Sequence, residues 1–81
     1  MDVAVRFFAF LRDEAGVEQC RLDLEPGASA LEARSRLIER YIELGRWLDY
    51  CRLAVNLEYQ PWEVVLHEGD ELSLIPPVSG G

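Results

Sequence analysis

Residues 17–45, VEQCRLDLEPGASALEARSRLIERYIELG, contain the pattern that decides the fold. In their first part apolar and polar residues alternate, with Cys20, Leu22 and Leu24 on one side and polar residues between them. This period of two predicts a half-buried strand over residues 17–24. The Pro-Gly pair after Glu25 ends the strand, because both residues interrupt regular structure. The remainder of the segment changes to a helical pattern.

That second part predicts a helix from Ser29 to Gly45. Ser29 and Glu32 have the spacing of a capping box, in which each side chain satisfies a free amide of the first turn, and Gly45 suits a left-handed cap at the end. One apolar stripe recurs at helical spacing and is made of Leu31, Leu37, Ile38, Tyr41 and Ile42. At 1.5 Å per residue the helix would be about 22 Å long, enough to cross a small sheet once.

On the N-terminal side, residues 3–10 are rich in β-branched and aromatic side chains and predict another strand. Phe7 lies on one face of that strand, and Phe8 and Phe10 lie on the other, so the strand is central or has its second face covered. Residues 11–16 form a polar connection that ends in glycine. We expect the strands on either side of it to pair as an antiparallel hairpin.

On the C-terminal side, the alternation of Leu53, Val55 and Leu57 predicts a third strand over residues 52–59, with Asn56 inside it. Three further segments complete the chain: a short strand or turn at 62–66, a turn at 67–70, and a last strand at 71–75. The helix has one apolar stripe and must bury it on one face of the sheet. The expected fold class is α+β: a β-grasp, or ubiquitin-like, domain over residues 1–75, with a mixed sheet of four to five strands, one main helix and an extended tail over residues 76–81.

Composition excludes several functions. A chain of 81 residues supports one domain with a thin core. All eight basic residues are arginine, so lysine Schiff-base and P-loop chemistry are excluded. The net charge of −7 disfavours nucleic acids and anionic membranes and suits a basic protein partner. Two cysteines are too few for a disulfide scaffold or a four-thiolate zinc site. We expect a soluble, cytoplasmic protein with free thiols.

Individual polar residues give no strong sign of catalysis or metal binding. His67 lacks a cysteine partner at zinc spacing and precedes a polar turn, so we expect a solvated turn residue. The nearby acidic residues have no EF-hand pattern around them. Cys20 and Cys51 fall in apolar register and are interpreted as core residues rather than nucleophiles, and Trp47 and Trp62 as packing residues. We therefore expect no metal site and no bound cofactor.

The C-terminal PPVSGG is different. Pro76 and Pro77 stiffen its base, whereas Gly80 and Gly81 leave its tip without side chains. A frayed terminus is the default for most domains. This combination instead suits a tail that places its terminal carboxylate in a channel too narrow for a Cβ. Because an ionised carboxylate is a poor acyl donor, it would need activation by ATP on a separate enzyme, after which sulfur could replace the leaving group.

At this point the chain resembles the MoaD family, the small sulfur-carrying subunits of molybdopterin synthase. The resemblance covers nearly the whole chain. Its motifs are Phe7-Phe8-Ala9 with Leu11-Arg12, Ala54-Val55-Asn56, Gly69-Asp70-Glu71-Leu72, and above all Pro76-Pro77-Val78-Ser79-Gly80-Gly81. One departure is Ile75, where family members often carry an aromatic residue; isoleucine still offers apolar burial.

The resemblance implies a sulfur-transfer cycle. An E1-like adenylyltransferase activates Gly81 with ATP, a sulfur donor protein converts it to a thiocarboxylate, and the tail enters the large subunit of a heterotetramer. Sulfur then passes to cyclic pyranopterin monophosphate. Catalytic residues belong to the large subunit, so this chain is the non-catalytic sulfur donor. From their alternation away from the helix, Phe8, Phe10 and Ile75 are predicted to form the partner interface.

Three alternatives remain open from the sequence. Sulfur carriers for thiamine thiazole, tRNA thiolation or an amino-acid pathway share the fold and the Gly-Gly end, although thiazole carriers usually lack the Pro-Pro-Val segment. A ubiquitin-like modifier would be joined to target lysines through Gly81. A plain interaction domain would leave the stiff tail unexplained.

Overall fold

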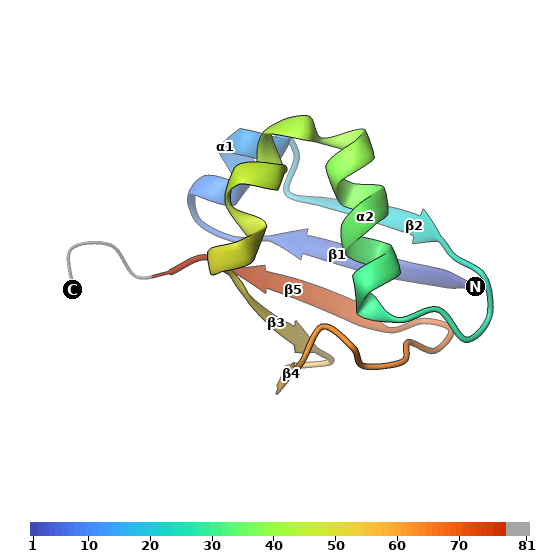
Figure 1. Ribbon diagram of the computed structural model, residues 1–81. Coiled ribbons are helices and arrows are strands. Elements are labelled where there is room, and N and C mark those ends of the chain that lie inside the picture. Colours follow the sequence, from blue (N-terminus) through green and yellow to red (C-terminus); the bar gives the residue numbers. More distant parts are fainter. Residues whose placement is uncertain (78–81) are drawn as a thin grey trace.

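The computed structural model describes residues 1–77, and this part of the chain forms one five-stranded sheet with a helix across it (Figure 1). In chain order the elements are β1 (Asp2–Phe7), α1 (Phe10–Ala15), β2 (Gln19–Asp23), α2 (Ala30–Arg40), the 3₁₀ helices η1 (Ile42–Arg46) and η2 (Leu48–Tyr50), β3 (Arg52–Val55), β4 (Glu58–Gln60) and β5 (Glu71–Ile75). The strand order is β2-β1-β5-β3-β4. The predicted β-grasp fold is therefore confirmed.

The centre of the sheet is a parallel pair formed by the first and last strands. β1 pairs with β5 from Ala4 opposite Glu71 to Phe7 opposite Leu74. The other pairs, β1–β2, β3–β5 and β3–β4, are antiparallel, and the first of these is the pairing predicted from the sequence. Because the two strands of a parallel pair run in the same direction, the C-terminal ends of β1 and β5 lie at the same end of the sheet.

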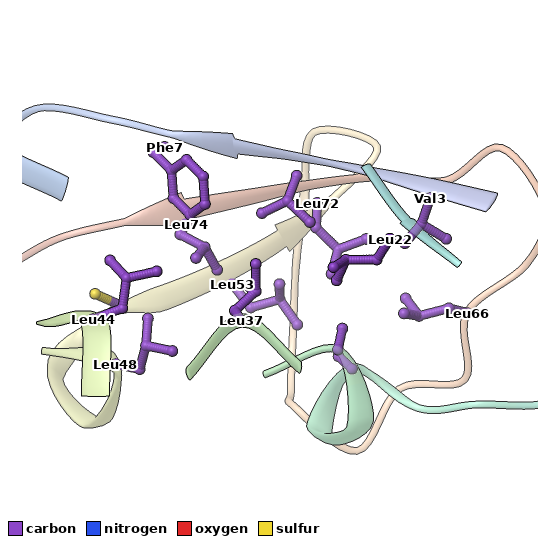
Figure 2. Close-up of a cluster of buried hydrophobic side chains, with 14 of the residues drawn as sticks. Val3, Phe7, Leu22, Leu37, Leu44, Leu48, Leu53, Leu66, Leu72 and Leu74 are labelled. Atoms are coloured by element: carbon purple, nitrogen blue, oxygen red, sulfur yellow. The ribbon is translucent and has the colours of Figure 1, made fainter. Parts of the chain in front are cut away.

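The core lies between α2 and one face of the sheet (Figure 2). Side chains that alternate along the strands point to this face, and each fully buried leucine or valine contributes about 1.5–3 kcal/mol relative to an exposed one. The strands supply Val3, Val5, Phe7, Leu22, Leu53, Leu72 and Leu74, and the helical segments supply Ala30, Ala33, Leu37, Leu44 and Leu48. The inward positions predicted for Leu22, Leu72 and Leu74 are confirmed.

The helix is shorter than the sequence indicated. α2 ends at Arg40, because Tyr41 has φ −129° and leaves the helical region. The chain continues in two 3₁₀ helices. Their apolar residues have nearly the spacing of an α-helix, so the sequence pattern predicts a longer helix. Gly45 lies inside η1 and adopts no left-handed conformation, so the predicted cap is wrong.

The start and the buried face of α2 also differ from the prediction. The Ser29 side chain makes no capping hydrogen bond, and Ser29 instead forms an isolated β-bridge with Val65. Leu31 and Ile42 are exposed, because the buried stripe passes through two alanines and Leu37. Small residues let the helix approach the sheet closely. A pattern of hydrophobic residues instead predicts that the larger Leu31 faces the sheet, because leucine is more hydrophobic than alanine.

Two predicted strands end early because the backbone turns at residues with positive φ. β1 stops at Phe7, Ala9 has φ 52° and ψ −133°, and α1 begins at Phe10 where we expected a strand and then a polar connection. β3 stops at Val55, and residues 56–57 form a two-residue turn into β4. The turn predicted at 67–70 and the strand at 71–75 are present, whereas the β-pairing of residues 62–66 is limited to the Val65 bridge.

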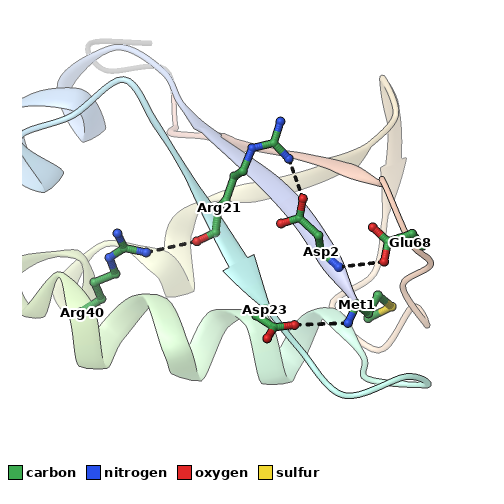
Figure 3. Close-up of polar contacts among 6 residues, drawn as sticks. All are labelled: Met1, Asp2, Arg21, Asp23, Arg40 and Glu68. Carbon is green, nitrogen blue, oxygen red and sulfur yellow. Dashed lines mark hydrogen bonds and ion pairs between the residues drawn. The ribbon is translucent and has the colours of Figure 1, made fainter.

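Polar contacts join the start of β1 to its neighbours (Figure 3). The Met1 ammonium lies 3.2 Å from Asp23 Oδ1, and Arg21 Nη1 donates to Asp2 Oδ2 at 2.7 Å. The Asp2 amide donates to Glu68 Oε1 at 3.1 Å. Exposed pairs of this kind contribute about 0–1 kcal/mol each, so they fix position more than they stabilise. In the described residues no helix is long and apolar enough to cross a membrane.

We predict that Ala9→Gly stabilises the fold. Its backbone lies in a region that costs an alanine about 1–3 kcal/mol, whereas glycine enters it freely and loses only about 0.5–1 kcal/mol through chain entropy. The free energy of unfolding, measured by urea denaturation, should rise by about 1 kcal/mol. The matched control Ala15→Gly, at an ordinary helical position, should lower it. A destabilised Ala9→Gly protein would contradict the assignment of strain.

Candidate functional site

The face of the sheet away from α2 carries an apolar groove of about 680 Å³. Its floor is made by Ala54 and Ser73, which face each other across β3 and β5 and are buried. Their strand neighbours Leu53, Leu72 and Leu74 point into the core, so these two must point to the opposite face. The remaining lining residues are Phe8, Ala9, Phe10, Leu57, Tyr59, Ile75, Pro76 and Pro77.

The three residues predicted as a partner interface all line this groove. Phe8 follows β1 and is 38% exposed, and Ile75 ends β5 and is half-buried. Phe10 arrives there as the first residue of α1 rather than as part of a strand. It is held by an edge-on contact with Trp47, with ring centroids 4.9 Å apart. Ala9, which lies between the two phenylalanines and has a positive φ, turns the chain so that both can reach the groove.

The base of the tail is also part of the groove. Pro76 and Pro77 follow β5 directly and line the groove beside Ile75. Proline fixes φ and has no N–H to continue the sheet, so the chain leaves β5 in an extended form. Val78, Ser79, Gly80 and Gly81 lie outside the described residues, and what we predict of them stays a prediction. The division into a domain over 1–75 and a tail over 76–81 likewise stays a prediction.

Arginines flank the groove although the chain is acidic overall. The Arg52 guanidinium carbon lies 3.9 Å from the centroid of the Tyr59 ring, and that of Arg6 lies 5.5 Å from the centroid of Phe8. Arg6 also approaches Glu71 at 3.8 Å. Cations stacked on aromatic faces keep those rings in place. A partner therefore meets an apolar surface that is flanked by Arg52 on one side and by the Arg6–Glu71 pair on the other.

Sequence reasoning missed the side of the groove formed by β3 and β4. Tyr59 is 58% exposed and Leu57 is 86% exposed, whereas the predicted alternation put Leu57 on the same face of one strand as the buried Leu53. The prediction failed because it ran one strand through a turn, and a turn reverses which face each residue takes. Asn56 was the available signal, since asparagine favours the first central position of a two-residue hairpin.

The acidic turn before β5 makes structural bonds. Asp70 Oδ2 accepts from the His67 amide at 2.8 Å, and its Oδ1 accepts from Asn56 Nδ2 at 2.9 Å. The His67 side chain itself is 79% exposed, which agrees with a solvated turn residue. Within residues 1–77 no group of three or more histidine, cysteine or acidic side chains is placed to hold a metal ion.

Both cysteines are free thiols, as expected. Burial raises the pKa of Cys51, whose thiol donates to the Trp47 carbonyl at 3.3 Å. Burial also raises the pKa of Cys20, and a hydrogen bond from Tyr41 offsets part of this rise. Neither cysteine lines the groove. The thiols therefore stay protonated near neutral pH and are poor nucleophiles.

Comparison with known proteins finds sulfur carrier subunits of molybdopterin synthase and a small archaeal modifier protein of similar structure. The family model described as the ThiS family matches residues 5–81. A molybdopterin synthase sulfur carrier subunit from Chlamydomonas reinhardtii is 35% identical over the full length of both chains. The crystal structure of SAMP1, a small archaeal modifier protein from Haloferax volcanii, superimposes over both full chains with a TM-score of 0.91 and 29% identity. A complex of subunits 1 and 2 of the molybdopterin-converting factor from Helicobacter pylori contains a chain with a TM-score of 0.73 and 30% identity, again over both full lengths.

We predict that stability falls as pH rises above about 9. Because the chain has no lysine, cysteines and tyrosines are the side chains that lose protons in this range. The pKa values of Cys20, Cys51 and Tyr41 are raised by folding, so the folded state binds more protons than the unfolded state there, and deprotonation favours unfolding. Urea denaturation from about pH 7 to pH 10.5 should show the loss, with a shallower slope for Cys51→Ser. An unchanged slope in that variant would contradict the role of Cys51.

Proposed function

The chain belongs to the ThiS family of sulfur carriers, and from that premise we propose that it is the sulfur-carrier subunit of a molybdopterin synthase. In the proposed cycle the Gly81 carboxylate attacks the α-phosphate of ATP and releases pyrophosphate. A sulfur donor protein then delivers sulfur at the oxidation level of sulfide, which displaces AMP and leaves a thiocarboxylate on Gly81. In the large subunit this sulfur passes to cyclic pyranopterin monophosphate, and water supplies the oxygen that restores the carboxylate of Gly81.

One observation supports this proposal most directly: the base of the tail is a wall of the groove. Pro76 and Pro77 line the same surface as Phe8 and Ile75. A protein that covers the groove must therefore contact the start of the tail as well. Docking and delivery of the terminal carboxylate are thereby coupled through a short, stiff connection.

The activation step is assigned to a separate enzyme for a chemical reason. A terminal carboxylate has a pKa of about 3.3–3.7 and is ionised at neutral pH, which makes it a poor acyl donor. The sequence has no glycine-rich phosphate loop and no lysine to neutralise phosphate charge. We therefore propose that ATP is consumed by an E1-like adenylyltransferase and that this chain binds no cofactor of its own.

We propose that the large subunit of the synthase covers the groove. The groove is apolar and open on a face that α2 leaves uncovered, and such a patch favours a protein partner. The similar Helicobacter pylori chain is found in a complex of subunits 1 and 2. Catalytic residues would then come from the large subunit, and two copies of each chain would form the proposed cytoplasmic heterotetramer.

The test is the intact mass of the chain after incubation with ATP, the activating enzyme and a sulfur donor. A gain equal to exchange of one oxygen for one sulfur is expected. Adding the large subunit and cyclic pyranopterin monophosphate should then reverse the gain and form molybdopterin. Loss of the sulfur to a thiazole precursor or a tRNA instead would place the chain in another sulfur-transfer pathway.

We predict that deleting Gly81, or adding one residue after it, abolishes sulfur transfer and leaves the melting temperature unchanged. The extended tail fixes how far its reacting carbon reaches into two active sites, and a misplacement of about 1 Å can cost ~100-fold in rate. Gly80→Val should act similarly, because its β-branched side chain would collide with a narrow channel. Normal molybdopterin formation by the shortened chain would refute the role of Gly81.

We predict that Phe8→Asp weakens binding to the large subunit by at least about tenfold without unfolding the chain. Its ring lies in the groove and is partly exposed, so a carboxylate there is tolerated by the free protein but opposes an apolar partner. Calorimetric titration measures the affinity. Val17→Asp is the matched control, since Val17 is 40% exposed and lies outside the groove. Equal losses in both variants would argue against a specific interface.

A second candidate function is protein modification through Gly81. The specific observation in its favour is the TM-score of 0.91 to SAMP1. The chain has no lysine and so cannot form isopeptide-linked chains with itself. Incubation with the activating enzyme and a cell extract separates the two functions: a modifier would yield conjugates resistant to thiol reagents, whereas a carrier would yield only the thiocarboxylate.

A further inference from the structure

Leu57 is the feature of the groove that the proposed function leaves unexplained. It is 86% exposed, more than any other large hydrophobic residue in the described part of the chain, and it lines the groove. Burial of such a side chain would be favourable, yet the fold holds it in water. A single exposed leucine is ordinary on a protein surface, so exposure alone does not assign it a role.

The backbone at Leu57 supplies an independent observation. Val55 pairs with Glu58, so Asn56 and Leu57 are the two central residues of a hairpin turn. Their φ angles are 50° and 71°, both in the left-handed region. Turns of this kind favour asparagine first and glycine second. Asn56 agrees with that preference, whereas a leucine at the second position is strained by its Cβ.

The turn is held in this conformation from outside. Asn56 Nδ2 donates to Asp70 Oδ1 at 2.9 Å, and Asn56 Oδ1 accepts from the Glu71 amide at 3.0 Å. The Asn56 amide donates to the Glu71 carbonyl at 2.8 Å. These three bonds, here called the Asn56 clamp, attach the turn to the first residue of β5 and the residue before it. Strain that is held by its surroundings and lies beside a binding surface is typical of functional sites.

The clamp also sets where Leu57 lies along the groove. Asn56 is bonded at the start of β5, whereas Pro76 and Pro77 follow its end. Leu57 therefore marks the end of the groove farthest from the tail. A contact at that distance restricts rotation of the docked domain more than one near the tail, and so fixes the direction in which the tail enters its partner.

Resting on the proposed function, we propose that Leu57 is a positioning residue that inserts into an apolar recess of the large subunit. Contact with one fixed apolar side chain far from the tail would orient the domain as well as bind it. The occupant is the large subunit because the groove is continuous from Leu57 to the base of the tail that this subunit must receive. In this proposal Leu57 occupies a turn position that favours glycine because its side chain is needed for recognition, and the strain lowers the stability of the fold.

The experiment compares Leu57→Gly and Leu57→Asn with Leu57→Met in the full chain. Glycine and asparagine tolerate the left-handed turn but remove the apolar group, whereas methionine keeps an apolar group of similar volume. We expect the first two to melt about 2–5 °C higher than the parent chain and to bind the large subunit about tenfold more weakly, equal to about 1.4 kcal/mol. Methionine should bind within about threefold. Ile42→Ala, which removes a 76% exposed side chain outside the groove, should bind normally.

A second readout separates positioning from simple contact. At saturating concentrations of each thiocarboxylated variant, the rate of molybdopterin formation should still fall for glycine and asparagine, because a bound but misoriented tail reacts slowly. A normal saturated rate would overturn the positioning role. If the Leu57 variants bound the large subunit with normal affinity while Phe8→Asp bound it weakly, the role of Leu57 would be overturned and the groove would remain the interface. Normal affinity of Phe8→Asp itself would overturn the interface on which the inference rests, and lower melting temperatures for both variants would overturn the strain.

Discussion

The parallel pairing of β1 with β5 is the constraint on which the rest of the structure depends. It joins the first and last strands at the centre of the sheet and fixes their register. Because parallel strands run the same way, Phe8 after β1 and Pro76 after β5 lie at the same end of the sheet. Main-chain pairing therefore brings the aromatic side of the groove and the base of the tail together.

Small residues and left-handed turns shape what that pairing brings together. Ala54 and Ser73 leave a hollow on the open face where larger side chains would fill it. At either side the backbone reverses at Ala9 and at Asn56–Leu57, the positions where the described residues other than glycine have positive φ. The strained backbone positions of the described residues thus lie at the proposed binding groove. Such strain is expected where a binding function is favoured at the cost of stability.

Elements set by hydrophobic periodicity could be predicted from the sequence, whereas those set by backbone reversal could not. β2 and β5 alternate cleanly between polar and apolar residues, and the prediction placed both correctly. Residues 3–10 are rich in β-branched and aromatic side chains and residues 52–59 alternate, so both predict strands, but both patterns continue through turns that no glycine marks. Phe8, Phe10 and Ile75 were nevertheless brought to one groove, since hydrophobicity identifies apolar residues even when their elements are misassigned. The places of Leu57 and Tyr59 could be predicted only if the position of the hairpin turn at residues 56–57 were known.

The short edge strand β4 has a consequence for how this domain can be recognised. β4 pairs through three residues and is followed directly by Pro61, which has no N–H to donate. A foreign strand would find little main chain to extend, so β-augmentation and edge-to-edge aggregation are both disfavoured at this side. A partner that binds near this edge must therefore recognise side chains on the open face of the sheet rather than pair with the main chain. Relatives that share the backbone could then diverge in partner choice by exchanging a few surface residues, with the hydrogen-bonded framework left intact.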